Sequence, residues 1–243
     1  MFELPEGPVQ MIRLHAYPDD PSLVTALAQQ IGAGLAAAIE MRGSASLAVS
    51  GGSTPKSLFA ALSHQPIAWQ QVQITLVDER WVDEASPDSN ARLVRNYLLC
   101  NAARAATFTE LKTLDLTAAA GVDQVEARIA PLFPLDIVVL GLGHDGHTAS
   151  WHPGAATLQA VLNPNNTRHC GVVVPVSALH ERMTLTLSAV LTARQIYLHV
   201  VGETKKKVLD VARQPGPIAV MPVRAVLQQD RVPVDIYYAP ETD

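Results

Sequence analysis

Cysteine is scarce in this sequence. Only 2 of the 243 residues, Cys100 and Cys170, are cysteines. Two cysteines this far apart fit neither a disulfide framework nor a zinc-binding spacing, so we expect two reduced thiols. Reduced thiols are typical of the cytoplasm, which is where we expect this protein.

Basic residues and long apolar runs are also limited. Lys and Arg number 18 against 23 Asp and Glu, so the formal net charge is -5. This balance argues against nucleic acid or an anionic membrane as a partner, and an anionic ligand would have to meet local positive charge. We find no signal peptide and no apolar run long enough to span a membrane, which predicts a soluble protein.

The length allows one large α/β core, with or without a small additional subdomain. Residues 1–10 contain two prolines and show no periodicity, so we expect a disordered extension there. We interpret residues 11–243 as a single α/β domain. Nothing in the sequence predicts an oligomeric state.

Strand and helix patterns alternate along the domain. Strands are predicted over residues 11–16, 46–50, 72–77, 137–140, 171–176, 183–187, 195–201 and 234–238. Helices are predicted near residues 20–39, 54–62, 88–98, 117–129, 203–213 and 223–229, with Asp20, Thr54 and Asp88 as N-caps. This alternation predicts a Rossmann-like fold, which is a mainly parallel sheet with helices on both faces.

Residues 136–153 are the most informative stretch. A wholly apolar strand, as in the middle of a parallel sheet, runs into a loop with glycines at 141, 143 and 146. Glycine permits positive φ angles and close approach of a ligand, so His144, Asp145 and His147 can project into a crevice beyond the strand. We predict that His147 is catalytic.

A second glycine turn is a candidate phosphate site. Gly51, Gly52, Ser53 and Thr54 follow a short apolar strand and precede a helix. Backbone N–H groups, the helix dipole and two hydroxyls suit a phosphate group. An ordinary strand-to-helix turn with a good cap is the alternative, and this segment alone would favour it.

Charged residues also follow the strand at 72–77. Asp78, Glu79 and Arg80 stand at its carboxyl end together with Trp81. Site residues gather at this edge of a parallel sheet. A surface Glu–Arg pair beside a rim tryptophan explains them equally well.

Taken together, these motifs resemble the 6-phosphogluconolactonases. The resemblance rests on residues 51–55, 78–80, 88–90 and 143–150 and covers roughly residues 20 to 240; it extends to the wider superfamily with the glucosamine-6-phosphate deaminases. It implies a sugar-phosphate crevice and no required cofactor. The implied reaction is hydrolysis of 6-phospho-D-glucono-1,5-lactone to 6-phosphogluconate, the second step of the oxidative pentose phosphate pathway.

The resemblance also points to Arg182 and Lys205 as substrate contacts. With Arg80 they would supply the local positive charge for phosphate, and one of the three is free to face the oxyanion instead. For Lys205 the alternative is a solvated helix face, because Lys206 and Lys207 follow.

The chain departs from the family at two places. Trp151, His152 and Pro153 stand where Leu-Phe-Pro is common, and His144 stands where Pro or Glu is usual. We expect His144 and His152 to be rim residues. A zinc site made of His144, His147 and His152 fits no established ligand spacing, so we expect no metal.

Lactone hydrolysis needs few groups. A single histidine can take a proton from water and return it to the leaving ring oxygen, and we assign this role to His147. Asp145 or Asp78 would orient the imidazole.

Two other functions remain open. A glucosamine-6-phosphate deaminase would share the fold and both loops, but its family has a glutamate soon after the histidine, and residues 148–151 contain no carboxylate. A non-catalytic sugar-phosphate sensor would keep the phosphate turn and need an output domain. We see no DNA-binding motif of that kind.

Overall fold

The structure is a computed structural model that describes residues 11–176 and 178–241. The extension predicted for residues 1–10 lies outside these residues. That residues 11–243 act as one domain stays a prediction.

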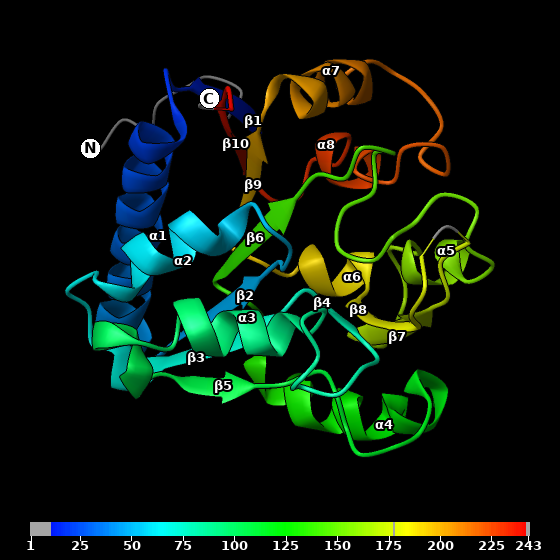
Figure 1. The fold of residues 1–243 in the computed structure, drawn as a ribbon, viewed down its shortest axis with the longest axis horizontal. Coiled ribbons are helices and arrows are strands. Elements are labelled where there is room, and N and C mark those ends of the chain that lie inside the picture. Colours follow the sequence, from blue (N-terminus) through cyan, green and yellow to red (C-terminus); the bar gives the residue numbers. More distant parts are fainter. Residues whose placement is uncertain (1–10, 177, 242–243) are drawn as a thin grey trace, which may run out of the picture.

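Seven parallel strands form the main sheet, in the order β1-β10-β9-β6-β2-β3-β5 (Figure 1). The strands are β1 (Ile12–Ala16), β2 (Ala45–Val49), β3 (Val72–Leu76), β5 (Thr107–Thr109), β6 (Ile137–Gly141), β9 (Gln195–Val201) and β10 (Val234–Ala239). Strands β2 and β6 lie in the middle and are buried almost throughout, which explains why β6 has no polar side chain and β2 has only Ser46. The prediction of a Rossmann-like, mainly parallel sheet is confirmed.

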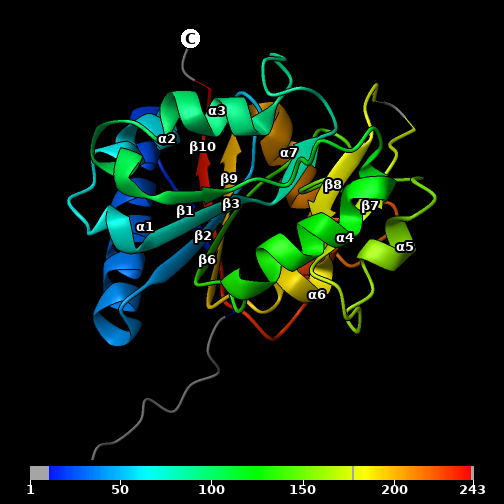
Figure 2. The same ribbon diagram turned by 90° about the horizontal axis from the view of Figure 1, so that it is seen from below.

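Helices cover both faces of this sheet. The longer ones are α1 (Asp20–Arg42), α2 (Pro55–Ser63), α3 (Asn90–Tyr97), α4 (Ala118–Ile129) and α7 (Glu203–Ala212). The shorter ones are α5 (Leu158–Val161), α6 (Leu187–Val190), α8 (Arg224–Leu227) and the 3-10 helices η1 (Trp69–Gln71), η2 (Asn101–Ala105) and η3 (Ala130–Leu132). In Figure 2, α1 and α2 lie to the left of the large sheet and α4 lies to its right.

A small antiparallel sheet stands beside the large one. Its strands, in the order β4-β8-β7, are β4 (Asp78–Arg80), β8 (Arg182–Leu185) and β7 (Cys170–Val173). The chain leaves the large sheet at Val77, whose carbonyl already accepts a hydrogen bond from Leu185 of the small sheet. The charged cluster predicted to end a strand therefore begins a strand of its own.

Helix α1 is the one helix in the described residues that is long and apolar enough to span a membrane by length and composition. Its side chains at four-residue spacing, Leu23, Leu27, Ile31 and Leu35, are fully buried in the core that α1 shares with the large sheet. This is the packing of a core helix, as its periodicity predicted.

The predicted helix starts are close but not correct. Asp19 rather than Asp20 caps α1, and Ser89 rather than Asp88 caps α3. In both cases a neighbour of similar capping strength lies one residue away, so local sequence does not distinguish them. Thr54 precedes α2 but makes no capping hydrogen bond.

The strand order creates a crevice between β2 and β6. These two strands are neighbours, yet β3 follows β2 on one side and β9 lies next to β6 on the other. Connections that leave adjacent parallel strands in opposite directions open a binding crevice at the carboxyl ends. The turn at residues 50–54 follows β2 and the loop at residues 142–148 follows β6, so both predicted site segments meet there.

His199 is a buried imidazole near the carboxyl end of β9. It is 3% exposed, and its Nε2 atom has no hydrogen-bond partner within the described chain. The nearest carboxylate contact is with Asp20, at 4.0 Å from Nε2 to Oδ1. Burial, together with the positive charge of Lys205, lowers the pKa of His199 to about 4, so the ring is neutral at pH 7.

His199 should therefore make the fold sensitive to acid. Between the unperturbed pKa of 6.5 and about 4, the unfolded chain binds a proton that the folded chain excludes. The free energy of unfolding therefore decreases as the pH is lowered through this range. A shift of this size corresponds to up to about 3 kcal/mol. Urea denaturation near pH 7 and near pH 4.5 should show a smaller acid-induced loss of stability for His199→Leu than for the wild type. Equal losses would contradict the assignment.

Candidate active site

A cavity of about 380 Å³ occupies the crevice at the carboxyl ends of β2 and β6. The predicted site residues that line it are Gly51, Gly52, Ser53, Thr54, Asp78, Arg80, His147 and Lys205. Asp145 and Arg182 are absent from the lining, and each lies next to a residue that belongs to it.

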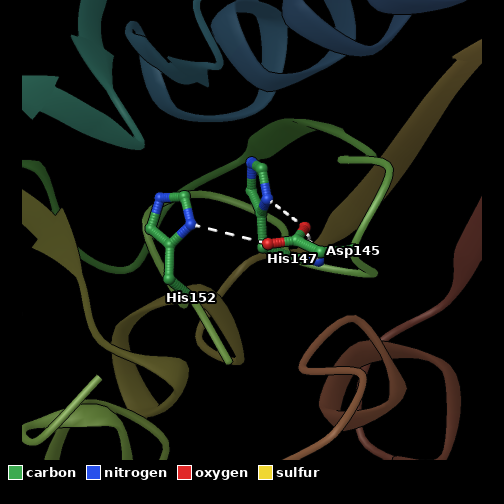
Figure 3. A group of neighbouring side chains, drawn as sticks. All are labelled: Asp145, His147 and His152. Carbon is green, nitrogen blue, oxygen red and sulfur yellow. Dashed lines mark hydrogen bonds and ion pairs between the residues drawn. The ribbon is translucent and has the colours of Figure 1, made fainter. Parts of the chain in front are cut away.

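Asp145 and His147 form a hydrogen-bonded pair (Figure 3). The Oδ1 atom of Asp145 lies 2.5 Å from Nδ1 of His147 and also accepts the backbone N–H of His147 at 3.1 Å. Because a carboxylate can only accept, Nδ1 carries the proton and Nε2 keeps a free lone pair. An imidazole that is neutral in this tautomer has the free lone pair that a general base needs.

The charge on Asp145 is stabilised by its neighbours. Burial alone would raise the pKa of Asp145, but the hydrogen bond from His147 and the contact with His152 outweigh it. The pKa of Asp145 therefore lies well below its ordinary value. An ionised Asp145 holds the His147 ring and would stabilise positive charge on that ring.

The loop glycines serve different purposes. Gly146 has a φ of 81°, the left-handed conformation that glycine favours. Gly143 has no such φ, but a Cβ atom there would lie 2.2 Å from the His147 ring. Gly141 has no positive φ, and a Cβ atom there would lie 4.0 Å from its nearest neighbour, Ser50. The prediction of positive φ angles is thus correct only for Gly146.

Asp78 lines the cavity but does not contact His147 in the described structure. Its carboxylate accepts a hydrogen bond from the hydroxyl of Ser150 at 2.6 Å, and its backbone oxygen accepts one from the side-chain amide of Asn90 at 2.9 Å. Of the two carboxylates considered for orienting the imidazole, the structure places Asp145 there.

The turn at residues 51–54 is shaped for an anion. Gly52 has a φ of 95°, and a Cβ atom on Gly51 would lie 1.8 Å from the Asn90 side chain. Within the described residues, no backbone N–H group of this turn donates a hydrogen bond to the protein. These groups stand before the N-terminus of α2, where the helix dipole favours negative charge.

Lys205 closes this turn from the other side. Its ammonium group donates to the hydroxyl of Thr54 at 2.9 Å. The backbone of Thr54 is helical, with φ -58° and ψ -42°, rather than extended as in a typical N-cap, and its side chain makes no capping hydrogen bond to α2. Burial lowers the pKa of Lys205 below its ordinary value. The solvated helix face that the sequence allowed describes Lys207, which is exposed, and not Lys205.

Arg80 and Arg182 are paired across β4 and β8. The Nε atoms of both are buried, with no hydrogen-bond partner in the described part of the chain. Burial lowers the pKa of Arg182, and the positive charge of Arg80 lowers it further. Two guanidinium groups held side by side with unused donors favour an anionic ligand between or beside them.

Glu79 has a structural role. It is 1% exposed, and its carboxylate accepts the backbone N–H groups of Arg80, Asn90 and Ala91 and the hydroxyl of Ser89. Burial raises the pKa of Glu79 to about 6 against the effect of these backbone hydrogen bonds. The surface Glu–Arg pair offered as an alternative is therefore wrong for Glu79.

Asp145, His147 and His152 also form a possible set of metal ligands, since their ligand atoms lie within 4.8 Å of one another. Two ligands of one tetrahedral zinc ion lie roughly 3.4 Å apart, given bonds of about 2.0–2.1 Å. The 2.5 Å between Asp145 and His147 is shorter, as expected for a shared proton. His144, which the imagined zinc site included, is not in this group.

Several residues of the site were not found from the sequence. His152, expected at the rim, is 8% exposed and lies against His147. His199 lines the cavity from β9, and Asn90 and Ser150 anchor Asp78. Only Asn90 and Ser150 carried a signal, because they belong to the quoted motifs.

Comparisons with known proteins agree with this geometry. The family described as glucosamine-6-phosphate isomerases/6-phosphogluconolactonase matches residues 18–234. A 6-phosphogluconolactonase of Mesorhizobium japonicum is 48% identical over 231 residues, which are 93% of this chain and 94% of that protein. The crystal structure of a 6-phosphogluconolactonase from Shewanella baltica superposes with a TM-score of 0.92 at 44% identity, over 96% of this chain and 100% of the other.

A monomeric glucosamine-6-phosphate deaminase is similar in fold, with a TM-score of 0.78 over 94% of this chain and 98% of the other. Its 15% identity limits the likeness to the fold. The family match and the two relatives of high identity carry the classification. The chain belongs to the family of glucosamine-6-phosphate isomerases and 6-phosphogluconolactonases.

Proposed function

We propose that this protein hydrolyses 6-phospho-D-glucono-1,5-lactone to 6-phosphogluconate. The observation that carries the proposal is the Asp145–His147 pair, which presents one free imidazole nitrogen to a cavity that also contains a phosphate-type turn. Relatives at up to 48% identity are 6-phosphogluconolactonases, and this supports the same reaction.

The phosphate group of the substrate binds at the turn after β2. The N–H groups of Gly52, Ser53 and Thr54 and the ammonium of Lys205 converge there, and all line the cavity. Arg80, backed by Arg182, supplies a second positive region beside Asp78. Charge-assisted hydrogen bonds of this kind are strong enough to orient a sugar phosphate.

The reaction then needs one proton shuttle. Nε2 of His147 takes a proton from a water molecule as that water attacks the lactone carbon, and Asp145 stabilises the resulting imidazolium. The tetrahedral intermediate collapses, the bond to the ring oxygen breaks, and the imidazolium returns the proton to that oxygen. A cationic side chain of the cavity stabilises the oxyanion.

Deamination of an amino sugar phosphate fits the site less well. That reaction opens a ring, moves a proton between carbons and releases ammonia, which calls for more acid-base groups. Residues 148–151 supply none: the Thr148 hydroxyl donates to Gly141, Ser150 donates to Asp78, and Trp151 is buried. A pure sensor would have no need for the Asp145–His147 pair.

The proposal includes a cytoplasmic location and a small-molecule sugar-phosphate lactone as partner, rather than nucleic acid or a membrane. The free thiols of Cys100 and Cys170 support a reducing compartment. The net charge of -5 supports a small anionic ligand bound by local positive charge rather than a polyanion.

The purified protein should accelerate 6-phosphogluconolactone hydrolysis well above the spontaneous rate. Because one imidazole is sufficient, a chelator should leave the rate unchanged. The same preparation should release no ammonia from glucosamine 6-phosphate. Ammonia release would replace the lactonase assignment by the deaminase one. If neither reaction occurs while sugar phosphates still raise the melting temperature, the protein is a sensor.

His147→Asn should lower kcat by about 100-fold to 10,000-fold, the usual contribution of a general base. The Asn amide can keep the hydrogen bond to Asp145, so the loop should stay folded and KM should change little. His64→Asn is the control, because His64 is an exposed histidine that does not line the cavity, and this variant should retain activity. A loss in the His147 variant of less than about threefold would exclude His147 as the base.

Lys205→Met should weaken binding of 6-phosphogluconate about 10-fold to 100-fold, as the loss of a charge-assisted hydrogen bond predicts. Lys207→Met removes the same charge from an exposed position of the same helix and should bind normally. Calorimetry measures both. Equal affinities in the two variants would show that Lys205 does not contribute to phosphate binding.

A further inference from the structure

His152 lies against the catalytic pair although the reaction described above does not use it. Its ring packs against the ring of His147, with centroids 4.2 Å apart and planes tilted by 39°. Figure 3 shows both imidazoles next to the Asp145 carboxylate, with a dashed line from each ring to a different oxygen. His152 is 8% exposed, so this arrangement belongs to the interior of the loop and not to its rim.

The two histidines divide the two oxygens of Asp145 between them. Oδ1 accepts both hydrogen bonds from His147, and Oδ2 faces Nδ1 of His152 at 3.8 Å. This distance is too long for a hydrogen bond and short enough for electrostatic attraction. A small movement of either side chain would close it.

The Nδ1 atom of His152 is buried and has no hydrogen-bond partner within the residues that the structure describes. A buried polar nitrogen without a hydrogen-bond partner is unfavourable, and an apolar ring of the same shape would avoid this cost. Packing against His147 requires only a flat ring, so it does not account for a nitrogen atom at the Nδ1 position of His152. The acceptor that Nδ1 faces is Asp145.

We propose that His152 is a positioning residue for the Asp145–His147 pair, in which its Nδ1–H group holds the second oxygen of Asp145 during turnover. The inference rests on the proposed function. Asp145 stands on a loop and its side chain is 43% exposed, and both hydrogen bonds from His147 end on Oδ1, so Oδ2 is left unrestrained. A second donor on Oδ2 restrains rotation of the carboxylate. The Oδ1 atom of Asp145 then stays directed at Nδ1 of His147 while His147 takes up and releases the proton.

Three substitutions separate the N–H group from the ring. His152→Phe keeps a flat ring for stacking and loses the donor. His152→Asn loses the ring, but its amide nitrogen occupies the place of Nδ1. His152→Gln carries its amide nitrogen at the place of Nε2, further from Asp145, and is the matched control for a polar side chain in the wrong position.

The positioning role predicts a specific order of activities. His152→Asn should retain kcat within about threefold, while His152→Phe and His152→Gln should lose up to about 100-fold, the scale that small misplacements of catalytic groups cost. KM and the affinity for 6-phosphogluconate should change little, because His152 does not line the cavity. The melting temperature of His152→Phe should equal or exceed that of the wild type, since an unpartnered buried donor is removed.

The opposite order would overturn the inference. If His152→Phe is active and His152→Asn is impaired, the ring serves packing alone. A melting temperature for His152→Phe far below the wild type would also support packing alone. Wild-type protein is assayed in the same series: absence of lactone hydrolysis there would remove the proposed function, and this inference with it, whereas an active wild type isolates the question of His152.

Discussion

One buried carboxylate holds the site segments together. Glu79 accepts backbone N–H groups from the end of β4 and from the start of α3. A carboxylate in such a position is tolerated only because these donors surround it. With α3 anchored in this way, Asn90 presses against Gly51 and donates to the backbone of Asp78. The turn at residues 51–54, strand β4 and helix α3 are therefore held together by direct contacts, although they are separate segments of the sequence.

The positive side chains of the site are concentrated in one region of an acidic protein. The protein carries a net charge of -5, yet Arg80, Arg182 and Lys205 gather at one crevice with few partners of their own. Burial weakens the basicity of Arg182 and Lys205, which is unfavourable in the free protein. An anionic sugar phosphate would compensate these charges, so the cost of holding them together is recovered on binding. In this way local positive charge would bind an anion although the protein as a whole is acidic.

Catalysis depends on orientation within a short loop. Gly146 turns the chain, Gly143 leaves room for the His147 ring, and the backbone of Val223 donates to the Gly146 carbonyl. These contacts place the His147 imidazole at the wall of the cavity. Asp145 and His152 then restrict how the ring and the carboxylate can rotate. A lactone, as an activated ester, needs little beyond such a pre-oriented base and a stabilised oxyanion.

The sequence alone determined the fold class, the two glycine loops and the candidate base, because apolar periodicity and glycine-rich turns are local properties. It also located Lys205 and Arg182, through family resemblance. Tertiary structure decided the rest. That Asp78 bonds Ser150, that Lys205 bonds Thr54, and that His199 is an interior residue all depend on which strands are neighbours. Strand order in a parallel sheet is set by packing between distant segments, and no local pattern records it.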